Sequence, residues 1–343
     1  MPHYKLALLG FGNVGQALAH LLLRKQAELH HRYDLTFSVT GIATGRHGTA
    51  INPAGINLES ALAAMAAGGD SLSALATLPP SGDSFDFIRR SGANVLFENS
   101  PVNYASGQPA IDHLQTALEL GMHTITANKG PVVHAYRALT NLAASKGRKF
   151  YFESAVMDGA PIFSLFRETL PTANVSAFRG VLNSTTNLIL TRMESGESFD
   201  QAVAYAQATG IAETDPSGDI DGWDATVKVA ALVTVLMDFP LLPTQVERQG
   251  IRGISPQEIQ RARQEGKRWK LVCSAERTTD SLRARVQPEM VPASSPFYQI
   301  EGTTSLIQFE TDVLGNLTLI ETDPGPETTA YGLLADFINA VKY

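Results

Sequence analysis

The chain has a single cysteine, no run of basic residues and no apolar segment long enough to cross a membrane. One cysteine, Cys273, excludes an intramolecular disulfide and fits a reducing compartment. A net charge of −7 without a basic cluster argues against nucleic acid or an anionic membrane as a partner. The longest apolar run, residues 229–237, falls well short of the roughly 20 residues that a transmembrane helix needs.

The first residues indicate a β-strand and not a targeting segment. Residues 4–9 form an apolar run that is too short for the core of a signal peptide and ends at once in glycines. We therefore expect a cytoplasmic protein. With 343 residues, 44% of them apolar, the chain is long enough for two hydrophobic cores, so two domains are expected. Cys273 is expected to be a small buried core residue.

A glycine-rich motif follows the first expected strand. A helix with apolar residues at helical spacing comes after it, and the motif consists of Gly10, Phe11, Gly12, Asn13, Val14 and Gly15. In this order, G-x-G-x-x-G is typical of dinucleotide binding, because its glycines permit a tight turn, approach of a pyrophosphate and close helix packing. We expect these six residues to bind the cofactor; the alternative is a glycine-rich turn without a ligand.

The second expected strand, residues 35–43, ends without the acidic residue that binds the ribose 2′-hydroxyl of NAD. Thr44 and Arg46 stand there instead. Both suit a 2′-phosphate, so the sequence favours NADP over NAD. The alternative is that Arg46 is a solvated loop cation.

Strands and helices then alternate along the first half of the chain. Strands expected at 94–98 and 123–127 alternate with helices at 110–120 and 132–144, which predicts an α/β fold with a Rossmann-type, doubly wound parallel sheet. Such sheets bind ligands at the carboxyl ends of their strands. We therefore expect Asn99, Ser100 and Lys129 in the cofactor crevice, although Lys129 alone would also suit a surface loop.

From about residue 149 the pattern changes to strands and helices of mixed order, which predicts a second, α+β domain. We expect a discontinuous NADP-binding domain, residues 1–135 plus 323–343. Residues 136–322 would form a substrate-binding and dimerisation domain.

Residues 210–228 hold five acidic side chains in a loop that leads into an apolar helix. Asp224 and Lys228 lie four residues apart and so share one helix face, which the apolar residues after them should carry inward. Alone, such a pair is often only a helix-stabilising ion pair worth a few tenths of a kcal/mol. Glu213 could equally cap a helix that begins near residue 221.

Four motifs together resemble the homoserine dehydrogenase family, in its short form without a C-terminal regulatory domain. The glycine motif is common elsewhere, whereas the other three are specific in this order: residues 126–131, 183–187 and 210–228. The resemblance implies reversible reduction of aspartate 4-semialdehyde to homoserine with NAD(P)H, in the biosynthesis of threonine, methionine and isoleucine.

The resemblance also implies roles for individual residues. Lys228 would be the acid/base and Lys129 a second cation at the reacting oxygen. The other roles are substrate binding by Glu213, Asp219, Asp224 and Thr185, a cofactor contact at Gly325, and a Na⁺ or K⁺ site at Glu153, Val156, Asp158 and Ala160. A homodimer is implied as well. Asp158 stands where the family commonly has a small residue, and Ser184 where it has glycine.

Two other functions remain open from the sequence. The chain could be a related dehydrogenase of another small aldehyde or keto acid, a possibility that Ser184 motivates. It could also be a non-catalytic NADP-binding sensor that has kept the fold.

Overall fold

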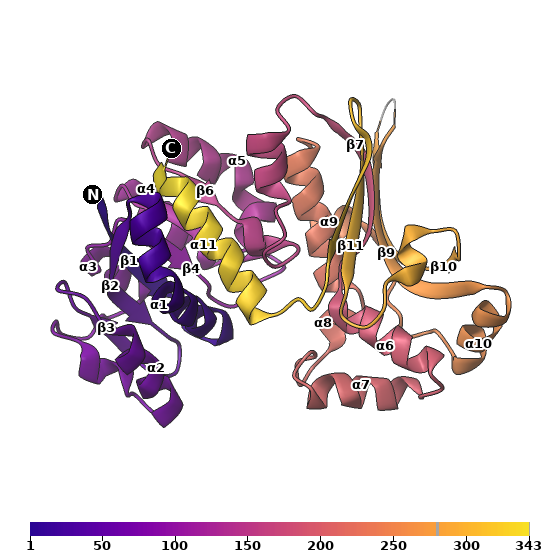
Figure 1. Cartoon of the computed structure of the whole chain (residues 1–343), viewed down its shortest axis with the longest axis horizontal. Helices are drawn as coiled ribbons and strands as arrows, with labels where there is room; N and C mark the ends of the chain where they lie inside the picture. The colour runs from indigo at the N-terminus through magenta and orange to yellow at the C-terminus, as the bar shows by residue number, and fades with distance from the viewer. Residues whose placement is uncertain (279–280, 343) are drawn as a thin grey trace. The chain divides into compact units, whose positions relative to one another are not determined.

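A computed structural model describes residues 1–278 and 281–342, which divide into two compact units (Figure 1). Met1–Pro161 and Gly325–Tyr343 form the first unit, and Ile162–Pro324 form the second. The first unit extends past residue 135, where the domain boundary was predicted. The reason is that β6 (Phe150–Tyr151) pairs with the first sheet and lies after α5 (Lys129–Ser145), a helix whose backbone is kinked at Ala135.

The sheet of the first unit has the strand order β3-β2-β1-β4-β5-β6. All its neighbouring strands pair in parallel except β3, which is antiparallel to β2. Its other strands are β1 (His3–Leu9), β2 (Thr36–Ala43), β3 (Thr49–Ile51), β4 (Val95–Glu98) and β5 (His123–Thr126). The order reverses between β1 and β4, whose carboxyl ends form the switch point at which such sheets bind ligands. The predicted Rossmann-type architecture is confirmed.

Helices cover both faces of this sheet because the buried side chains of β1 alternate between them. Leu6 and Leu8 belong to a core with α1 (Asn13–Tyr33) and α11 (Pro326–Lys342), whereas Ala7 and Leu9 belong to a core with residues of α3 (Ser84–Arg90) and α4 (Ala110–Glu119). This alternation has the period of two that an extended strand imposes. The unit also holds α2 (Leu58–Ala67) and a short 3₁₀ turn, Leu72–Leu75. Neither β3 nor α3 was predicted.

The sheet of the second unit is mixed, with the order β12-β11-β7-β9-β10-β8. Its neighbours pair antiparallel, apart from the parallel pair of β10 and β8. The strands are β7 (Val175–Val181), β8 (Glu247–Arg248), β9 (Lys267–Arg277), β10 (Leu282–Pro292), β11 (Ser305–Thr311) and β12 (Gly315–Glu321). Cys273 is buried in β9, as predicted.

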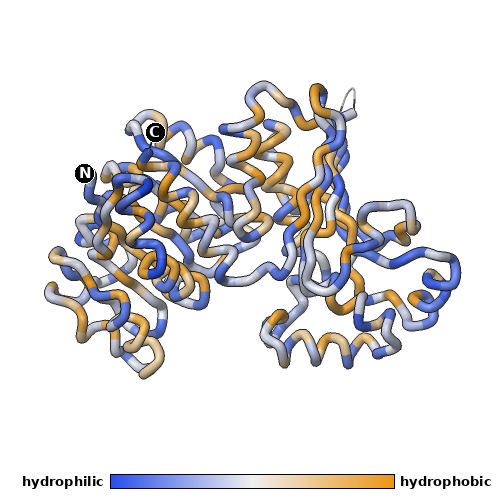
Figure 2. The backbone as a smooth tube through the Cα atoms, in the orientation of Figure 1, coloured by the Kyte–Doolittle hydropathy of each residue, from blue (hydrophilic) through white to orange (hydrophobic). Residues whose placement is uncertain are grey.

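Helix α9 (Trp223–Leu236) packs against β9 and β10 and is the most apolar helix of this unit (Figure 2). Most of its side chains from Asp224 to Thr234 are buried, so the prediction that this helix is buried is confirmed. Residues Leu165–Thr169 form a π-helical turn. The remaining helices are α6 (Ser184–Glu194), α7 (Phe199–Ala208), α8 (Ser217–Ile220) and α10 (Pro256–Gln264). Within the described residues, no helix has both the length and the apolar character that crossing a membrane requires.

Candidate active site

The turn between β1 and α1 has the backbone geometry that a bound dinucleotide requires. Gly10 has φ +96°, and a Cβ there would lie 2.2 Å from the carbonyl oxygen of Asn99; a Cβ at Gly15 would lie 2.5 Å from that of Gly10. A side chain therefore fits at neither position. At Gly12, which caps α1, a Cβ would meet nothing within 4 Å, and no side chain of the described residues caps the helix. The first amides of α1 are thus open to a phosphate.

The loop after β2 holds the two residues expected at a 2′-phosphate. The Thr44 hydroxyl donates to Gly48 O (3.2 Å) and accepts from the His47 amide (2.7 Å), so its proton is used within the loop. Arg46 is exposed, and no carboxylate of residues 1–278 and 281–342 forms an ion pair with it. Arg46 is the group of this loop that can contact an added phosphate.

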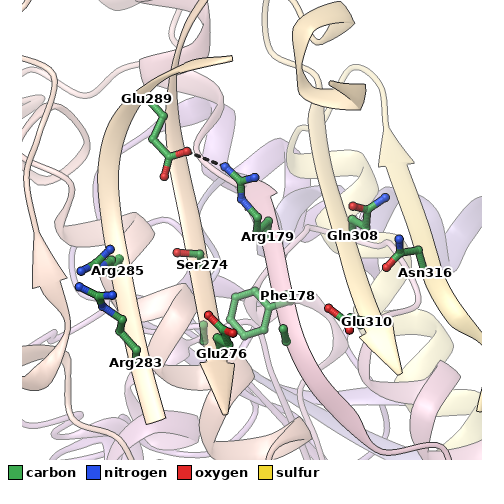
Figure 3. Close-up of a pocket in the computed structure, with 12 residues that line it drawn as sticks. Phe178, Arg179, Ser274, Glu276, Arg283, Arg285, Glu289, Gln308, Glu310 and Asn316 are labelled. Carbon is green, nitrogen blue, oxygen red and sulfur yellow. Dashed lines mark hydrogen bonds and ion pairs between the residues drawn. The ribbon is translucent and has the colours of Figure 1, made fainter. Parts of the chain in front are cut away.

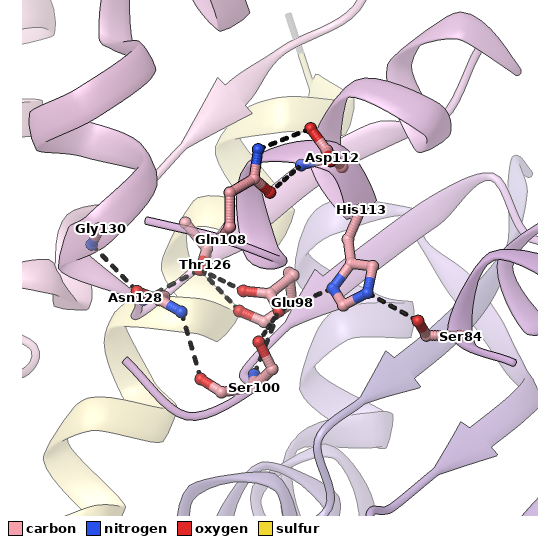
Figure 4. A network of polar contacts seen from close by, with 9 residues as sticks. All are labelled: Ser84, Glu98, Ser100, Gln108, Asp112, His113, Thr126, Asn128 and Gly130. Atoms are coloured by element: carbon pink, nitrogen blue, oxygen red, sulfur yellow. Dashed lines mark hydrogen bonds and ion pairs between the residues drawn. The ribbon is translucent and has the colours of Figure 1, made fainter. Parts of the chain in front are cut away.

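The carboxyl ends of β4 and β5 lie together, as predicted, and polar contacts join them (Figure 4). Both polar atoms of the Asn99 side chain are buried without a hydrogen-bond partner among the described residues. Such an amide normally has partners, so a bound cofactor group fits here. The side-chain NH₂ group of Asn128 donates to Ser100 O (3.2 Å), and its Oδ1 accepts from the backbone amide of Gly130 (3.0 Å). Lys129 follows Asn128 directly and is the first residue of α5.

A cluster of polar side chains in the second unit surrounds the start of α9. The Asn183 amide donates to Asp219 Oδ1 (2.7 Å) and to Asp224 Oδ2 (3.0 Å). The Lys228 ammonium lies 3.1 Å from Asp224 Oδ2 and donates to Leu182 O (2.6 Å). The cluster therefore joins three parts of the chain, the start of α6, the acidic loop and α9.

Burial and a neighbouring charge act on Asp219. Loss of solvent raises its pKa, and the negative charge of Asp224 raises it further. Hydrogen bonds from Asn183 and Thr185 and the charge of Lys228 oppose this rise. The two carboxylates are thus held close together at an electrostatic cost, which favours a cation beside them.

Comparison with protein families shows the family to which the chain belongs. A model described as homoserine dehydrogenase matches residues 161–338, and one described as the NAD-binding domain of homoserine dehydrogenase matches residues 10–153. The chain belongs to the homoserine dehydrogenase family. It is therefore an NAD(P)-dependent oxidoreductase that acts on a CH–OH group.

Relatives support this homoserine dehydrogenase assignment over almost the whole chain. The NAD(+)-dependent homoserine dehydrogenase of Pseudomonas canavaninivorans is 35% identical, with 99% of this chain and 96% of that protein covered. A homoserine dehydrogenase of Methanocaldococcus jannaschii is 34% identical, with 97% of each covered. The crystal structure of a putative homoserine dehydrogenase from Archaeoglobus fulgidus covers 98% of both chains at 28% identity and a TM-score of 0.86. A hyperthermophilic archaeal homoserine dehydrogenase in complex with NADPH covers 99% of this chain and 98% of its own, at 28% identity and a TM-score of 0.83.

The remaining residues of the homoserine dehydrogenase motif lie around the cluster to different extents. Thr185 is buried on α6, and its hydroxyl lies 3.3 Å from Ile211 O and beside the Asp219 carboxylate. Glu213 is exposed, and its backbone carbonyl accepts from Gln207. Gly325 belongs to the first unit and lies just before α11, where its amide donates to the Thr328 hydroxyl.

The expected cation ligands lie in the first unit, where residues 153–160 contact α11. The Glu153 amide donates to Asp336 Oδ2 (2.7 Å), and Glu153 is buried. The Asp158 carboxylate accepts from the Thr329 hydroxyl (2.8 Å), and Asp158 has φ +39°. Val156 is buried, and the Ala160 amide closes a turn on Met157 O. Carboxylate and carbonyl oxygens, which suit hard cations, are thus present in this segment.

Asn183 has a role that the sequence did not reveal. Its side-chain oxygen caps α6 by accepting from the Thr186 amide (2.8 Å), and this fixes the direction of its NH₂ group toward Asp219 and Asp224. An asparagine directly before an expected helix is a recognisable N-cap signal. Its second function depends on residues 36 and 41 positions away, which no local pattern identifies.

A polar groove on the second sheet is separate from this cluster (Figure 3). Arg179 and Glu289 form an ion pair of 2.5 Å across it. It is lined by Ala177, Phe178, Arg179, Ser274, Ala275, Glu276, Arg283, Arg285, Glu289, Gln308, Glu310 and Asn316. None of the expected substrate-binding residues lines it.

Proposed function

We propose that this protein reduces aspartate 4-semialdehyde reversibly to homoserine, for the biosynthesis of threonine, methionine and isoleucine, with Lys228 as the acid/base. The observation that carries the proposal is the donor inventory of Lys228. An ammonium group has three donors. Asp224 and Leu182 O take two of them. Within residues 1–278 and 281–342 the third has no acceptor, so it can donate to the oxygen of the reacting aldehyde.

The rest of the cluster suits an amino-acid substrate. When bound, the nicotinamide cofactor supplies the hydride. Lys228 gives its proton to the aldehyde oxygen during reduction and takes a proton from the hydroxyl during oxidation. Asp219 and Asp224 bind the substrate ammonium together with Glu213 and Thr185, and Lys129 acts as a second cation at the reacting oxygen.

Replacing Lys228 by alanine tests this assignment. We expect the turnover of homoserine with NADP to fall by a factor of about 10² to 10⁴, the usual contribution of a general acid/base. NADPH binding should be retained, because the glycine turn lies in the first unit. Lys267→Ala is the control, since Lys267 forms an ion pair with Glu265 on the surface. Equal activity of the two variants would refute the role. If the wild type reduces aspartate 4-semialdehyde no faster than other short aldehydes, the proposed substrate is refuted.

We also propose that the protein prefers NADP to NAD. The exposed Arg46, after a strand end without an acidic residue, supports this preference. The relatives point in both directions, because one is named NAD(+)-dependent and another was crystallised with NADPH. The ratio of kcat/KM for NADP and NAD measures the preference. Arg46→Glu should lower kcat/KM for NADP and leave NAD almost unaffected; a wild-type ratio in favour of NAD would contradict the proposal.

The proposal also includes a bound cation and a homodimer. Glu153, Val156, Asp158 and Ala160 are proposed to bind Na⁺ or K⁺ through a carboxylate and backbone oxygens, which kinetics in Na⁺, K⁺ and tetramethylammonium salts would test. The protein is also proposed to form a homodimer through the second sheet, whose open groove carries charges of both signs. Sedimentation analysis of the wild type and Arg179→Glu measures the oligomeric state, and a monomeric wild type would contradict the dimer.

A further inference from the structure

A buried carboxylate in the first unit, Glu98, lies outside the residues to which the proposed reaction assigns a role. It is the last residue of β4 and is fully buried. Removing an ionised carboxylate from water is costly unless hydrogen bonds or opposite charges compensate for it. The partners of Glu98 therefore indicate what the structure gains from a carboxylate at this position.

One carboxylate oxygen of Glu98 holds the loop that follows β4. Glu98 Oε1 accepts from the Ser100 amide (3.2 Å) and from the Ser100 hydroxyl. The same oxygen lies 3.4 Å from His113 Nδ1 on α4. His113 is itself buried, and its Nε2 lies 2.8 Å from the Ser84 hydroxyl. Glu98 thus connects the Asn99–Ser100 loop to two helices (Figure 4).

The other carboxylate oxygen lies beside the segment that leads to Lys129. The Thr126 hydroxyl, at the end of β5, lies 3.3 Å from Glu98 Oε2 and donates to the backbone oxygen of Glu98 at 2.6 Å. It also accepts from the Asn128 amide (2.9 Å). Asn128 caps α5, and Lys129 is the first residue of that helix. The position of Lys129 is therefore determined through Thr126 and Asn128.

The two loops are also joined directly, by the bond from the Asn128 side chain to Ser100 O. Glu98 is the residue whose side chain contacts both Ser100 and Thr126. A shift of the loop after β4 would break the bonds from Ser100 to the carboxylate, which are charge-assisted and about twice as strong as neutral ones. A shift of the loop after β5 would break the bond from the Thr126 hydroxyl to the Glu98 backbone oxygen. The network consequently fixes the loop that bears Lys129 against the loop that bears Asn99.

We propose that Glu98 is a positioning residue of the reaction, which sets Lys129 relative to the cofactor-binding loop after β4 through Thr126 and Ser100. The inference rests on the proposed function, because it assumes that Lys129 acts at the reacting oxygen. Glu98 takes no part in proton transfer. Its effect should therefore be on the catalytic step and not on the binding of the cofactor phosphates, for which the glycine turn and Arg46 are the proposed contacts.

Thr126→Val tests the proposal with little change in side-chain shape. It removes the hydroxyl that joins Glu98 to Asn128. Thr124→Val is the matched control, because Thr124 is an equally buried threonine of β5 whose hydroxyl contacts Lys149 O instead. Both variants lose one buried hydroxyl from the same strand, so a purely structural effect should be similar in the two.

The readout is kcat per NADPH-binding site, titrated by fluorescence, with homoserine and with homoserine deuterated at C4. We expect Thr126→Val to lower kcat at least about tenfold, since small misplacements of catalytic groups cost up to 10²-fold. The isotope effect should increase as hydride transfer becomes slower, and the dissociation constant of NADPH should change less than about threefold. Loss of folded protein would change neither kcat per site nor the isotope effect.

The result that overturns the inference is a kcat per site of Thr126→Val equal to that of Thr124→Val. If Thr126→Val does not fold, Glu98→Gln takes its place, because glutamine keeps the shape but removes the charge and replaces one accepting oxygen by an NH₂ donor. It should lower kcat per site in the same direction. A wild-type value for Glu98→Gln would likewise overturn the proposal. A wild-type protein that does not oxidise homoserine would instead refute the proposed function, so the two failures are distinguishable.

Discussion

Asn183 provides the sharpest test of how the second unit is built, because its side chain has two separable functions. Its oxygen caps α6, and its NH₂ group donates to the carboxylates of Asp219 and Asp224. Asn183→Ser keeps a residue that caps helices nearly as well but removes both donors. Asn183→Ala removes the cap as well.

The magnitude follows from these contacts. A hydrogen bond to a charged group contributes about 1.5 to 3 kcal/mol, so loss of the two donors should lower the free energy of unfolding by about 3 kcal/mol or more. Loss of the cap in Asn183→Ala should cost about 1 kcal/mol in addition. The pKa of Asp219 is raised by burial and by Asp224, and the Asn183 donor opposes this rise. Its removal should therefore move the acid limb of kcat/KM to higher pH.

Urea unfolding and the pH dependence of kcat/KM measure both effects. Asn57→Ser is the matched control, because Asn57 caps α2 through the Ser60 amide in the same way, away from these carboxylates. It should change stability by only a few tenths of a kcal/mol. The reasoning is refuted if Asn183→Ser is as stable as Asn57→Ser and its acid limb stays at the wild-type pH.

Two further predictions concern buried ionisable groups. The pKa of Asp219 is raised by burial and by Asp224, so the folded protein binds this proton more tightly than the unfolded chain and loses stability as pH rises above about 4. Asp219→Asn should therefore raise Tm at pH 7 while it lowers turnover; a lower Tm in calorimetry would contradict this. Burial lowers the pKa of Lys270 from 10.5 to about 8, so the unfolded chain binds more protons between these values. The stability of the wild type relative to Lys270→Met should rise by about 3 kcal/mol from pH 8 to 10.5 in urea unfolding, and a flat difference would contradict the assignment.

Much of the fold could be predicted because its signals are local. The apolar run of β1, the glycines before α1 and the apolar run of α9 each lie within one short stretch of sequence. Elements without such patterns were missed. Strand β3 has only three residues, and α3 begins in a stretch rich in glycine, serine and proline, where turn signals dominate. The end of the first unit was placed too early because pairing of the two-residue β6 is a long-range contact.

By itself, the sequence determined the residue types of the site and the elements that carry them. Its motifs identified the homoserine dehydrogenase family and placed Asp224 and Lys228 on one helix face, because helix geometry relates residues four apart. The tertiary structure alone decided which distant groups those residues contact. Asn183 meets Asp219 and Asp224, and Glu98 meets Thr126, through hydrogen bonds that span 28 to 41 residues. Such partners are chosen by packing of the whole unit, in which each buried polar group must find a partner, and local spacing carries no information about them.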